Sequence, residues 1–235
     1  YFVLKNFLSI FFTFLLIINL SGGFMKNFKR FTILIFLLLM YILISASAYT
    51  NAVCSDISDS VFRLHVIANS NSAEDQNLKY IVRDNALEYM SSITSGVTSK
   101  EEIIEIISNH LEEFKQIAQD TVYEKGFNYE VSLEIGNFEF PTKTYGDVSF
   151  PAGFYDALKI KIGNADGQNW WCVMFPPLCF IDVSSGIVPE ESKEILESEL
   201  NEEEYSLITG TENENKIKFK IVEVLQNFKF SGIFM

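Results

Sequence analysis

The segment Tyr145–Asp182 constrains the fold of this 235-residue chain more than any other part of the sequence. It contains both tryptophans and two of the three cysteines, and it includes the dipeptide Pro176-Pro177. Because neither proline can donate a backbone hydrogen bond, regular strand pairing must end there. Before this break, Ala157–Ile162 and Trp170–Phe175 flank the Gly/Asn/Asp-rich segment Gly163–Asn169. This pattern predicts a β-hairpin that ends at a rigid bend.

The rest of the chain shows the apolar periodicities of further strands and helices. Alternation of apolar and polar residues predicts strands over Val61–Ala68, Phe127–Ile135 and Ile217–Val224. Helical spacing predicts a helix over Ala73–Ile93 capped by Ser72, a second helix capped by Thr98 and stopped near Gly126, and an acidic helix over Pro189–Glu204. The expected fold is α+β, a single compact domain over residues 61–230 with a mainly antiparallel sheet and two or three packed helices, after an amino-terminal signal segment.

Two apolar runs, Phe7–Leu20 and Phe31–Ile44, precede the predicted domain. The second run follows the basic segment Lys26–Arg30 and ends at Ala46-Ser47-Ala48. A basic segment, an apolar core and small residues at positions −3 and −1 are the parts of a secretory signal peptide. Residues 25–48 are therefore predicted to be a signal peptide that is cleaved between Ala48 and Tyr49. An uncleaved membrane anchor is the alternative, although the core is shorter than the roughly 20 apolar residues of a spanning helix.

Residues 1–24 and 49–60 flank this signal. The chain begins at Tyr1, and Gly22-Gly23 lies just before Met25, where two glycine codons can spell a purine-rich ribosome-binding sequence. We hypothesise that Met25 is the true start and that residues 1–24 are translated upstream sequence, with a two-helix hairpin as the alternative. Residues 49–60 are predicted to be a flexible linker that carries Cys54 as a free thiol.

Charge is divided unequally along the chain. Residues 1–48 contain four basic and no acidic residues, whereas the remainder contains 14 Lys/Arg against 31 Asp/Glu. Nucleic-acid binding needs positive charge to displace counterions from phosphates, and electrostatic attraction to anionic lipid needs it as well. The acidic domain is therefore not expected to bind nucleic acid or to be held on lipid by its charge.

His65 is the residue that best fits a catalytic role, because it lies near the end of a predicted strand beside Asn69, Ser70 and Asp75. The other interpretation, which we favour, is that these side chains tie down a turn through hydrogen bonds, because no second motif supports a general base. The sequence has no phosphate loop or dinucleotide fingerprint, and its cysteines supply only half of a zinc site. No enzyme activity, cofactor or small-molecule substrate is predicted.

Six residues separate Cys172 from Cys179, across the proline bend. A disulfide between them would close a small loop and stabilise the fold by roughly 2–3 kcal/mol. Two buried thiols on adjacent strands, where cysteine behaves as a small apolar residue, fit the same sequence. Both alternatives stay open at this point.

Trp170 and Trp171 are neighbours on a predicted strand, so their side chains face opposite sides of the sheet and cannot both enter one core. One of them must cover a second layer or remain exposed. Exposed aromatic residues beside rigid prolines are typical of binding interfaces, whereas packing under the Gly163–Asn169 loop is the structural alternative.

Two blocks of this sequence resemble the stage II sporulation protein R family. The first block runs from Arg63 to Ser70 and continues through Asp75-Gln76, Leu78-Lys79 and Arg83-Asp84. The second comprises Tyr145-Gly146, Pro151-Ala152-Gly153, Tyr155, Ala157-Leu158, Ile162-Gly163 and Asn169–Phe180. With the leader and the predicted carboxyl-terminal strand, the resemblance covers most of residues 60–225, and the second block is the more specific of the two.

The resemblance implies a role that composition and spacing do not show. Members of the family are made in the forespore and exported into the space between forespore and mother cell. There they trigger a membrane-embedded sporulation aspartic protease to process the precursor of the mother-cell sigma factor. On this view the chain is a secreted signal of an endospore-forming bacterium, a ligand and not a catalyst. It would be membrane-anchored if the signal segment is not cleaved.

Two groups of residues are expected to contact such a partner. The first is an apolar patch beside the proline bend, formed by Trp171 with Phe175, Pro176 and Pro177, and Trp170 is a further candidate contact residue. The second is a polar network at the strand-to-helix junction, formed by Arg63, His65, Asn69 and Asp75 together with Arg83 and Asp84. Since Arg83 and Asp84 are adjacent on a helix, we expect one to point inward and the other outward.

Two functions of other classes compete with signalling. An exported hydrolase that uses His65 would act on cell-wall fragments or peptides. A passive component of the spore envelope would be incorporated stably and would need no specific partner.

Overall fold

The computed structural model describes residues 26–179 and 188–209. The chain divides into two compact units, one made of residues 1–54 and 217–235 and the other of residues 55–216. The first apolar run and the strand expected over Ile217–Val224 lie outside the described residues.

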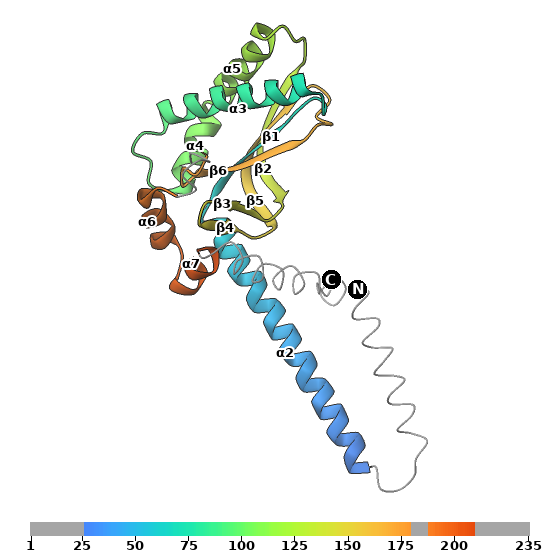
Figure 1. The fold of residues 1–235 in the computed structure, drawn as a ribbon. Helices are drawn as coiled ribbons and strands as arrows, with labels where there is room; N and C mark the ends of the chain where they lie inside the picture. Colours follow the sequence, from blue (N-terminus) through green and yellow to red (C-terminus); the bar gives the residue numbers. More distant parts are fainter. Residues whose placement is uncertain (1–25, 180–187, 210–235) are drawn as a thin grey trace. The chain divides into compact units, whose positions relative to one another are not determined.

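Helix α2, Lys26–Asp59, contains the predicted signal segment (Figure 1). Its part from Arg30 to Asp59 is long and apolar enough to cross a membrane, with a mean hydropathy of 2.5 over its most apolar window. Large apolar side chains such as Leu34 and Leu38 are exposed along it. An apolar helix of this kind near the amino terminus fits a signal segment or a membrane anchor. The cleavage between Ala48 and Tyr49 stays a prediction.

The segment predicted as a flexible linker, residues 49–60, is helical up to Asp59. No glycine or proline interrupts the sequence from Lys26 to Asp59, so helical hydrogen bonding can propagate without a break. The last turn is also held by the domain, because the Ile57 side chain is completely buried.

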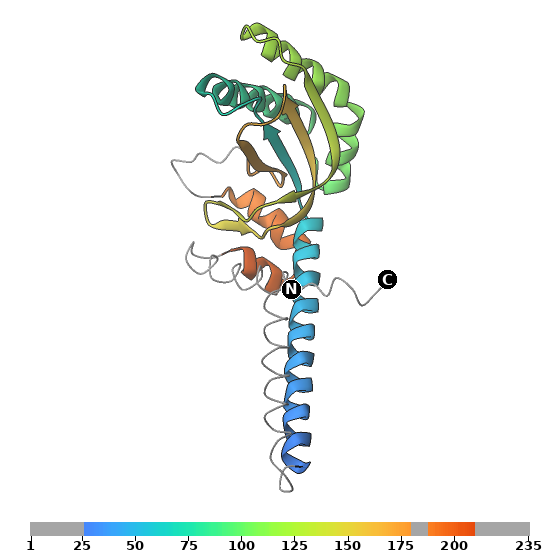
Figure 2. The ribbon, with the colours of Figure 1, turned by 90° about the vertical axis from the view of Figure 1, so that its right-hand side faces the viewer.

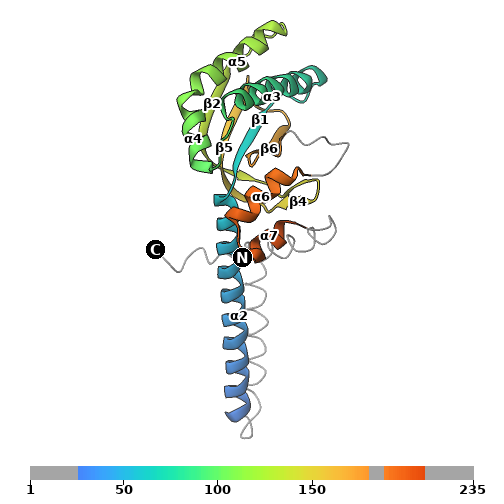
Figure 3. The same ribbon diagram turned by 90° about the vertical axis from the view of Figure 1, so that its left-hand side faces the viewer.

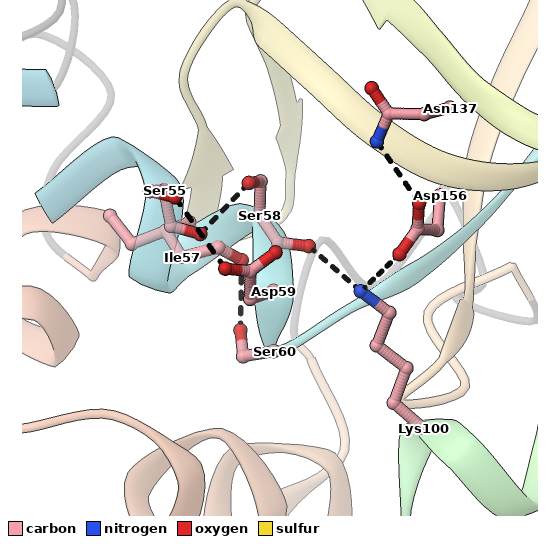
Figure 4. A network of polar contacts seen from close by, with 8 residues as sticks. All are labelled: Ser55, Ile57, Ser58, Asp59, Ser60, Lys100, Asn137 and Asp156. Atoms are coloured by element: carbon pink, nitrogen blue, oxygen red, sulfur yellow. Dashed lines mark hydrogen bonds and ion pairs between the residues drawn. The ribbon is translucent and has the colours of Figure 1, made fainter. Parts of the chain in front are cut away.

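Figure 4 shows how polar contacts fix this last turn. The Lys100 Nζ atom donates to the Ser58 carbonyl oxygen at 3.4 Å and lies 2.8 Å from the Asp156 carboxylate. Asn137 donates to the same carboxylate at 3.0 Å. Burial raises the pKa of Asp156, but these two hydrogen bonds outweigh it and hold the pKa below its usual value. Residues 55–60 are therefore an integral part of the second unit.

A four-stranded sheet forms the centre of this unit, with the strand order β2-β5-β1-β6. The strands are β1 (Phe62–Ile67), β2 (Val131–Phe140), β5 (Gly153–Ile162) and β6 (Asn169–Phe175). Strand β1 runs parallel to β5 and antiparallel to β6, and β2 runs antiparallel to β5. The sheet is thus mostly antiparallel, and the predicted α+β class is confirmed.

The hairpin predicted between Ala157–Ile162 and Trp170–Phe175 is wrong. These segments are β5 and β6, but β1 lies between them and pairs with both. The connection crosses over the end of β1, where the Gly167 N–H donates to the Ala68 carbonyl oxygen at 2.9 Å. Turn signals in a sequence report only local structure. They cannot show that β1, which comes much earlier in the chain, is inserted between β5 and β6.

Three helices cover one face of the sheet (Figures 1 and 2): α3 (Ala73–Ile93), α4 (Lys100–Asn109) and α5 (Leu111–Glu124). Helix α3 has the predicted bounds, and the Ser72 hydroxyl accepts from the Asp75 N–H at 3.1 Å as expected of a cap. The second predicted helix is capped by Ser99 instead of Thr98. It is also broken at His110, which separates α4 from α5.

The other face of the sheet carries a small hairpin, β3 (Lys143–Tyr145) and β4 (Val148–Phe150). Figure 3 shows α6 (Glu190–Glu199) and α7 (Glu202–Ile208) beside it. The predicted single acidic helix is therefore two helices. Leu200 is extended, and the Asn201 side chain starts α7 by accepting from the backbone of Glu203 and Glu204.

Candidate functional site

Arg63 lies on the face of β1 that points away from the helices, because strand residues alternate and Leu64 belongs to the helix-covered core. Its guanidinium carbon is 4.2 Å from the ring centre of Phe140 and 4.6 Å from that of Tyr155. Nη2 donates to the Tyr145 hydroxyl at 2.9 Å, whereas Nε and Nη1 have no partner among the described residues. The side chain is completely buried. It organises an aromatic cluster and is not exposed for a partner.

His65 lies next to Arg63 on the same face of the strand. Its ring stacks on that of Trp171, with centroids 5.6 Å apart and planes 19° apart. Nε2 donates to the Asn169 side-chain oxygen at 2.7 Å. Burial lowers the pKa of His65, and the charges of Lys159, Lys161 and Arg63 lower it further, against the opposing effect of the Asn169 hydrogen bond. The ring is therefore neutral at physiological pH.

No nucleophile or carboxylate among the described residues is bonded to this ring. The Nδ1 atom of His65 is buried without a hydrogen-bond partner in the described part of the chain. General-base catalysis requires the base within hydrogen-bond reach of the group that it deprotonates. The geometry thus gives no support to the hydrolase built on His65.

The two tryptophans face opposite sides of the sheet, as predicted. Trp170 lies on the helix side, where its ring makes an edge contact with Tyr80 at 5.5 Å and lies 4.3 Å from the Arg83 guanidinium carbon. Trp171 lies on the other side, between His65 and the Lys143 ammonium group, which is 4.6 Å from its ring centre. Both rings are half-buried.

The apolar patch expected beside the proline bend does not form. Phe175 and Pro176 are buried, and only Pro177 is exposed. The reason is an irregularity in the pairing of β1 with β6, where Phe62 pairs with Phe175 but the next residue, Arg63, pairs with Val173. The extra residue turns Phe175 into the helix-covered core, away from Trp171.

Cys172 and Cys179 form a disulfide, with their Cα atoms 5.3 Å apart. It closes the loop that contains the two prolines. The same loop is held by the N–H groups of Leu178 and Cys179, which both donate to the Val173 carbonyl oxygen at 3.1 Å. The structure therefore decides between the two alternatives that the sequence left open.

The polar residues of the β1–α3 junction form a closed hydrogen-bond network. Asn69 and Ser70 donate to the Asp75 carboxylate at 2.8 and 2.6 Å, and the Asn69 side-chain oxygen accepts from the Asn164 N–H at 3.0 Å. Burial raises the pKa of Asp75, but the hydrogen bonds from Ser70 and Asn69 outweigh it and leave the pKa below its usual value. A Cβ atom on Gly163 would come within 2.3 Å of the Asn69 side chain, so the crossover loop packs directly on this network.

Arg63 and His65 are not part of this junction network, contrary to expectation, because they point to the opposite face of β1. Arg83 and Asp84 are further along α3 and form an ion pair with each other at 2.6 Å. The Arg83 side chain is 18% exposed and that of Asp84 60%, which agrees with the expected inward and outward orientations.

A slot lies between β3 and β6, and we call it the β3–β6 slot. It has a volume of about 300 Å³ and is lined by residues 143–146, residues 169–172, Leu178 and Cys179. The Tyr145 hydroxyl reaches across and donates to the Trp171 carbonyl oxygen at 3.0 Å. Sequence reasoning selected Trp170, Trp171 and the cysteines but missed Lys143, Tyr145 and Asn169. These three residues come next to the tryptophans only through tertiary packing.

A sequence model of the family described as Stage II sporulation protein R matches residues 58–185. Stage II sporulation protein R of Bacillus subtilis (strain 168) is 40% identical over 175 residues, which cover 72% of this chain and 78% of that protein. The chain belongs to the stage II sporulation protein R family. No solved structure matches the chain.

The β3–β6 slot and a second hollow of the domain differ in their position relative to the family model. A second, larger hollow of about 630 Å³ lies between the α3–α4 loop, the end of β6 and α6, with Glu191 and Glu194 on its α6 wall. That wall is outside residues 58–185, which the family model matches, whereas all residues that line the β3–β6 slot are inside this range. The slot is therefore the better candidate for a function that is common to the family. Among residues 26–179 and 188–209, no cluster of three or more His, Cys, Asp or Glu side chains could hold a metal ion.

Proposed function

We propose that this chain is an exported signal of endospore formation, which activates a membrane-embedded aspartic protease that processes the precursor of the mother-cell sigma factor. Membership of the stage II sporulation protein R family carries this proposal and supports a role in sporulation. The site of action is the space between forespore and mother cell, and the partner is the membrane-embedded protease.

The contacts made by the polar side chains favour a ligand over a catalyst. Arg63 is packed among aromatic rings, Asp75 is bonded within the β1–α3 junction, and His65 is bonded to Asn169. Each of these side chains organises the fold, and His65, the one candidate base, is bonded to no nucleophile among the described residues. A protein that acts by binding needs a rigid surface and no catalytic set, which agrees with this arrangement.

Helix α2 supports export, by either of two routes. Cleavage between Ala48 and Tyr49 would release the domain, and retention of the helix would anchor it. In both cases residues 55–60 remain attached, and these are the residues that Lys100 and the burial of Ile57 fix to the domain. Mass spectrometry of the mature amino terminus distinguishes the routes, since a terminus at Tyr49 shows cleavage.

The proposal is tested by complementation. The full chain is expressed in the forespore of a sporulating strain that lacks its own copy, and processing of the sigma-factor precursor is followed by immunoblot. Restored processing is the expected result. The proposal is wrong if the precursor stays unprocessed although the chain is folded and exported, as judged by protease protection of the domain.

A further inference from the structure

Among the described residues only β1 pairs with β6, so β6 is at an edge of the described sheet. The carbonyl oxygen of Val173 accepts from Leu178 and Cys179, and that of Trp171 accepts from the Tyr145 hydroxyl. Both carbonyl groups therefore point away from β1. Because backbone groups of one residue lie on one side of a strand, the N–H of Trp171 and the backbone of Asn169 also face the β3–β6 slot. Since the carbonyl groups of Trp171 and Val173 already accept hydrogen bonds, the part of the edge that could pair with another segment is the Trp171 N–H and the backbone of Asn169.

The side chains that line the slot favour a negatively charged ligand. Lys143 lies over Trp171 and has no ion-pair partner among the described residues. None of the residues that line the slot is acidic, although the whole chain has a net charge of −13. Lys159 and Lys161 lie on the same face of the sheet and share Glu134. The lining of the slot thus has one cation, Lys143, and no carboxylate, and this cation would attract an acidic group.

One further observation points to a missing hydrogen-bond acceptor. The indole Nε1 atom of Trp171 is buried and has no acceptor among the described residues. Buried polar atoms are nearly always hydrogen-bonded, to protein, water or ligand. The Nε1 atom of Trp170, on the helix side, is buried without an acceptor as well, so the proposal rests on the strand edge and on Lys143.

We propose that the β3–β6 slot receives an extended, acidic segment of the partner protein. The segment pairs with the edge of β6 at Asn169 and Trp171, and an acidic side chain binds Lys143. This inference rests on the proposed function, because it names the surface through which the protease is recognised. The larger hollow beside α6 is the weaker choice, since Glu191 and Glu194 would repel an acidic segment and its α6 wall is outside residues 58–185, which the family model matches.

Charge reversal at Lys143 tests the proposal against a matched control. Lys143→Glu and Lys115→Glu make the same change of charge, and Lys115 is exposed on α5, on the other side of the sheet. Each variant of the full chain is expressed in the sporulating strain without its own copy. Lys143→Glu is expected to reduce sigma-factor processing about tenfold, because an attractive contact becomes a like-charge contact. Lys115→Glu is expected to match wild type, and thermal unfolding of both purified variants checks that the fold is retained.

Photocrosslinking provides a second measurement that does not depend on stability. Benzoylphenylalanine is placed at Thr144, an exposed residue of the slot, or at Glu112, an exposed residue of α5. We expect a crosslink to the epitope-tagged protease from position 144 only, and mass spectrometry should locate it next to an acidic, extended segment. A crosslink from position 112 alone, or from 144 to a basic segment, overturns the inference.

The two proposals fail in different ways. If wild-type chain restores processing but Lys143→Glu is as active as Lys115→Glu, the slot is not the recognition surface and signalling stands. If folded and exported wild-type chain restores no processing, both proposals are wrong.

Discussion

The two faces of the central sheet are made by the same strands but are packed by different chemistry. Toward the helices, β1 presents Leu64 and Val66, which join Leu158, Ile160 and Cys172 in an apolar core. Toward the β3–β4 hairpin, the same strand presents Arg63 and His65, which are buried among aromatic rings.

We assign stability to the helix-covered face and recognition to the face toward the β3–β4 hairpin. The helix-covered face buries apolar side chains whose contribution scales with the area removed from water. On the other face, four side-chain nitrogens of Arg63, His65 and Trp171 are buried without a partner among the described residues, which lowers stability. On the helix side only the Trp170 Nε1 atom is buried in this way. A face that concentrates such groups next to a strand edge has the properties expected of a binding surface. The following changes test this division, beginning with the largest effect.

Leu64→Ala should give the largest loss, because it opens a cavity in the helix-covered core where Leu64 is completely buried. We expect the free energy of unfolding to fall by about 2–5 kcal/mol. Urea unfolding of the purified protein measures it. A loss below about 1 kcal/mol would show that this face is not the principal core.

Removal of the disulfide should have the next largest effect. In the double variant Cys172→Ala/Cys179→Ala the loop between them is no longer closed, so the unfolded chain gains entropy and the free energy of unfolding should fall by about 2–3 kcal/mol. The matched control is wild-type protein with a reducing agent, which should unfold at the same urea concentration as the variant. Wild type that is unaffected by the reducing agent would contradict this.

Arg63→Met, on the face toward the β3–β4 hairpin, should change the free energy of unfolding much less than the two changes above. Methionine keeps most of the packing against Phe140 and Tyr155, and Tyr145 still has the Trp171 carbonyl oxygen as its acceptor. The desolvation penalty of an unpaired buried cation is removed while the cation–π attraction is lost, so the free energy of unfolding should stay within about 1 kcal/mol of wild type. Arg63→Ala, which also removes the packing, is the comparison and should be clearly less stable. Equal losses for both variants would show that the charge itself is required.

The smallest expected effect is the contribution of His65 to the decrease in stability at acidic pH. Its pKa is below the ordinary value of 6.5 in the folded protein, so between these two pKa values the unfolded chain binds more protons than the folded one. Stability should therefore decrease as the pH falls from 6.5 toward the folded pKa. In His65→Gln this decrease should be weaker than in wild type, as measured by unfolding at pH 7 and pH 5. The carboxylates of buried Asp75 and partly exposed Asp156 have lowered pKa values and should contribute only at more acidic pH, where their loss of charge removes stability.

Local sequence signals predicted the elements whose causes are local. Helix α3 has the bounds that its periodicity and the Ser72 cap indicate, and β1 lies within the predicted strand. Strand β2 begins at Val131 and not at Phe127, because the Gln119 side chain binds the Tyr129 carbonyl oxygen and the Val131 N–H. Periodicity alone could not show this contact from a neighbouring helix.

The site was predicted less well than the fold, because its contacts are distant in sequence. His65 and Asn169 are bonded across 104 positions, and Arg63 and Tyr145 across 82. Alternation placed Trp170 and Trp171 on opposite faces, but it could not identify Lys143 as the residue above Trp171. The irregular pairing that buries Phe175 has no signal in the sequence that we can name.

The most direct test of the account combines this chain with loss of its proposed partner. In a sporulating strain without its own copy, the ratio of processed to precursor sigma factor is measured with the membrane-embedded aspartic protease active and with the protease inactivated. The account predicts that the chain restores processing only when the protease is active. Processing that persists without an active protease would contradict the claim that this protein signals through it.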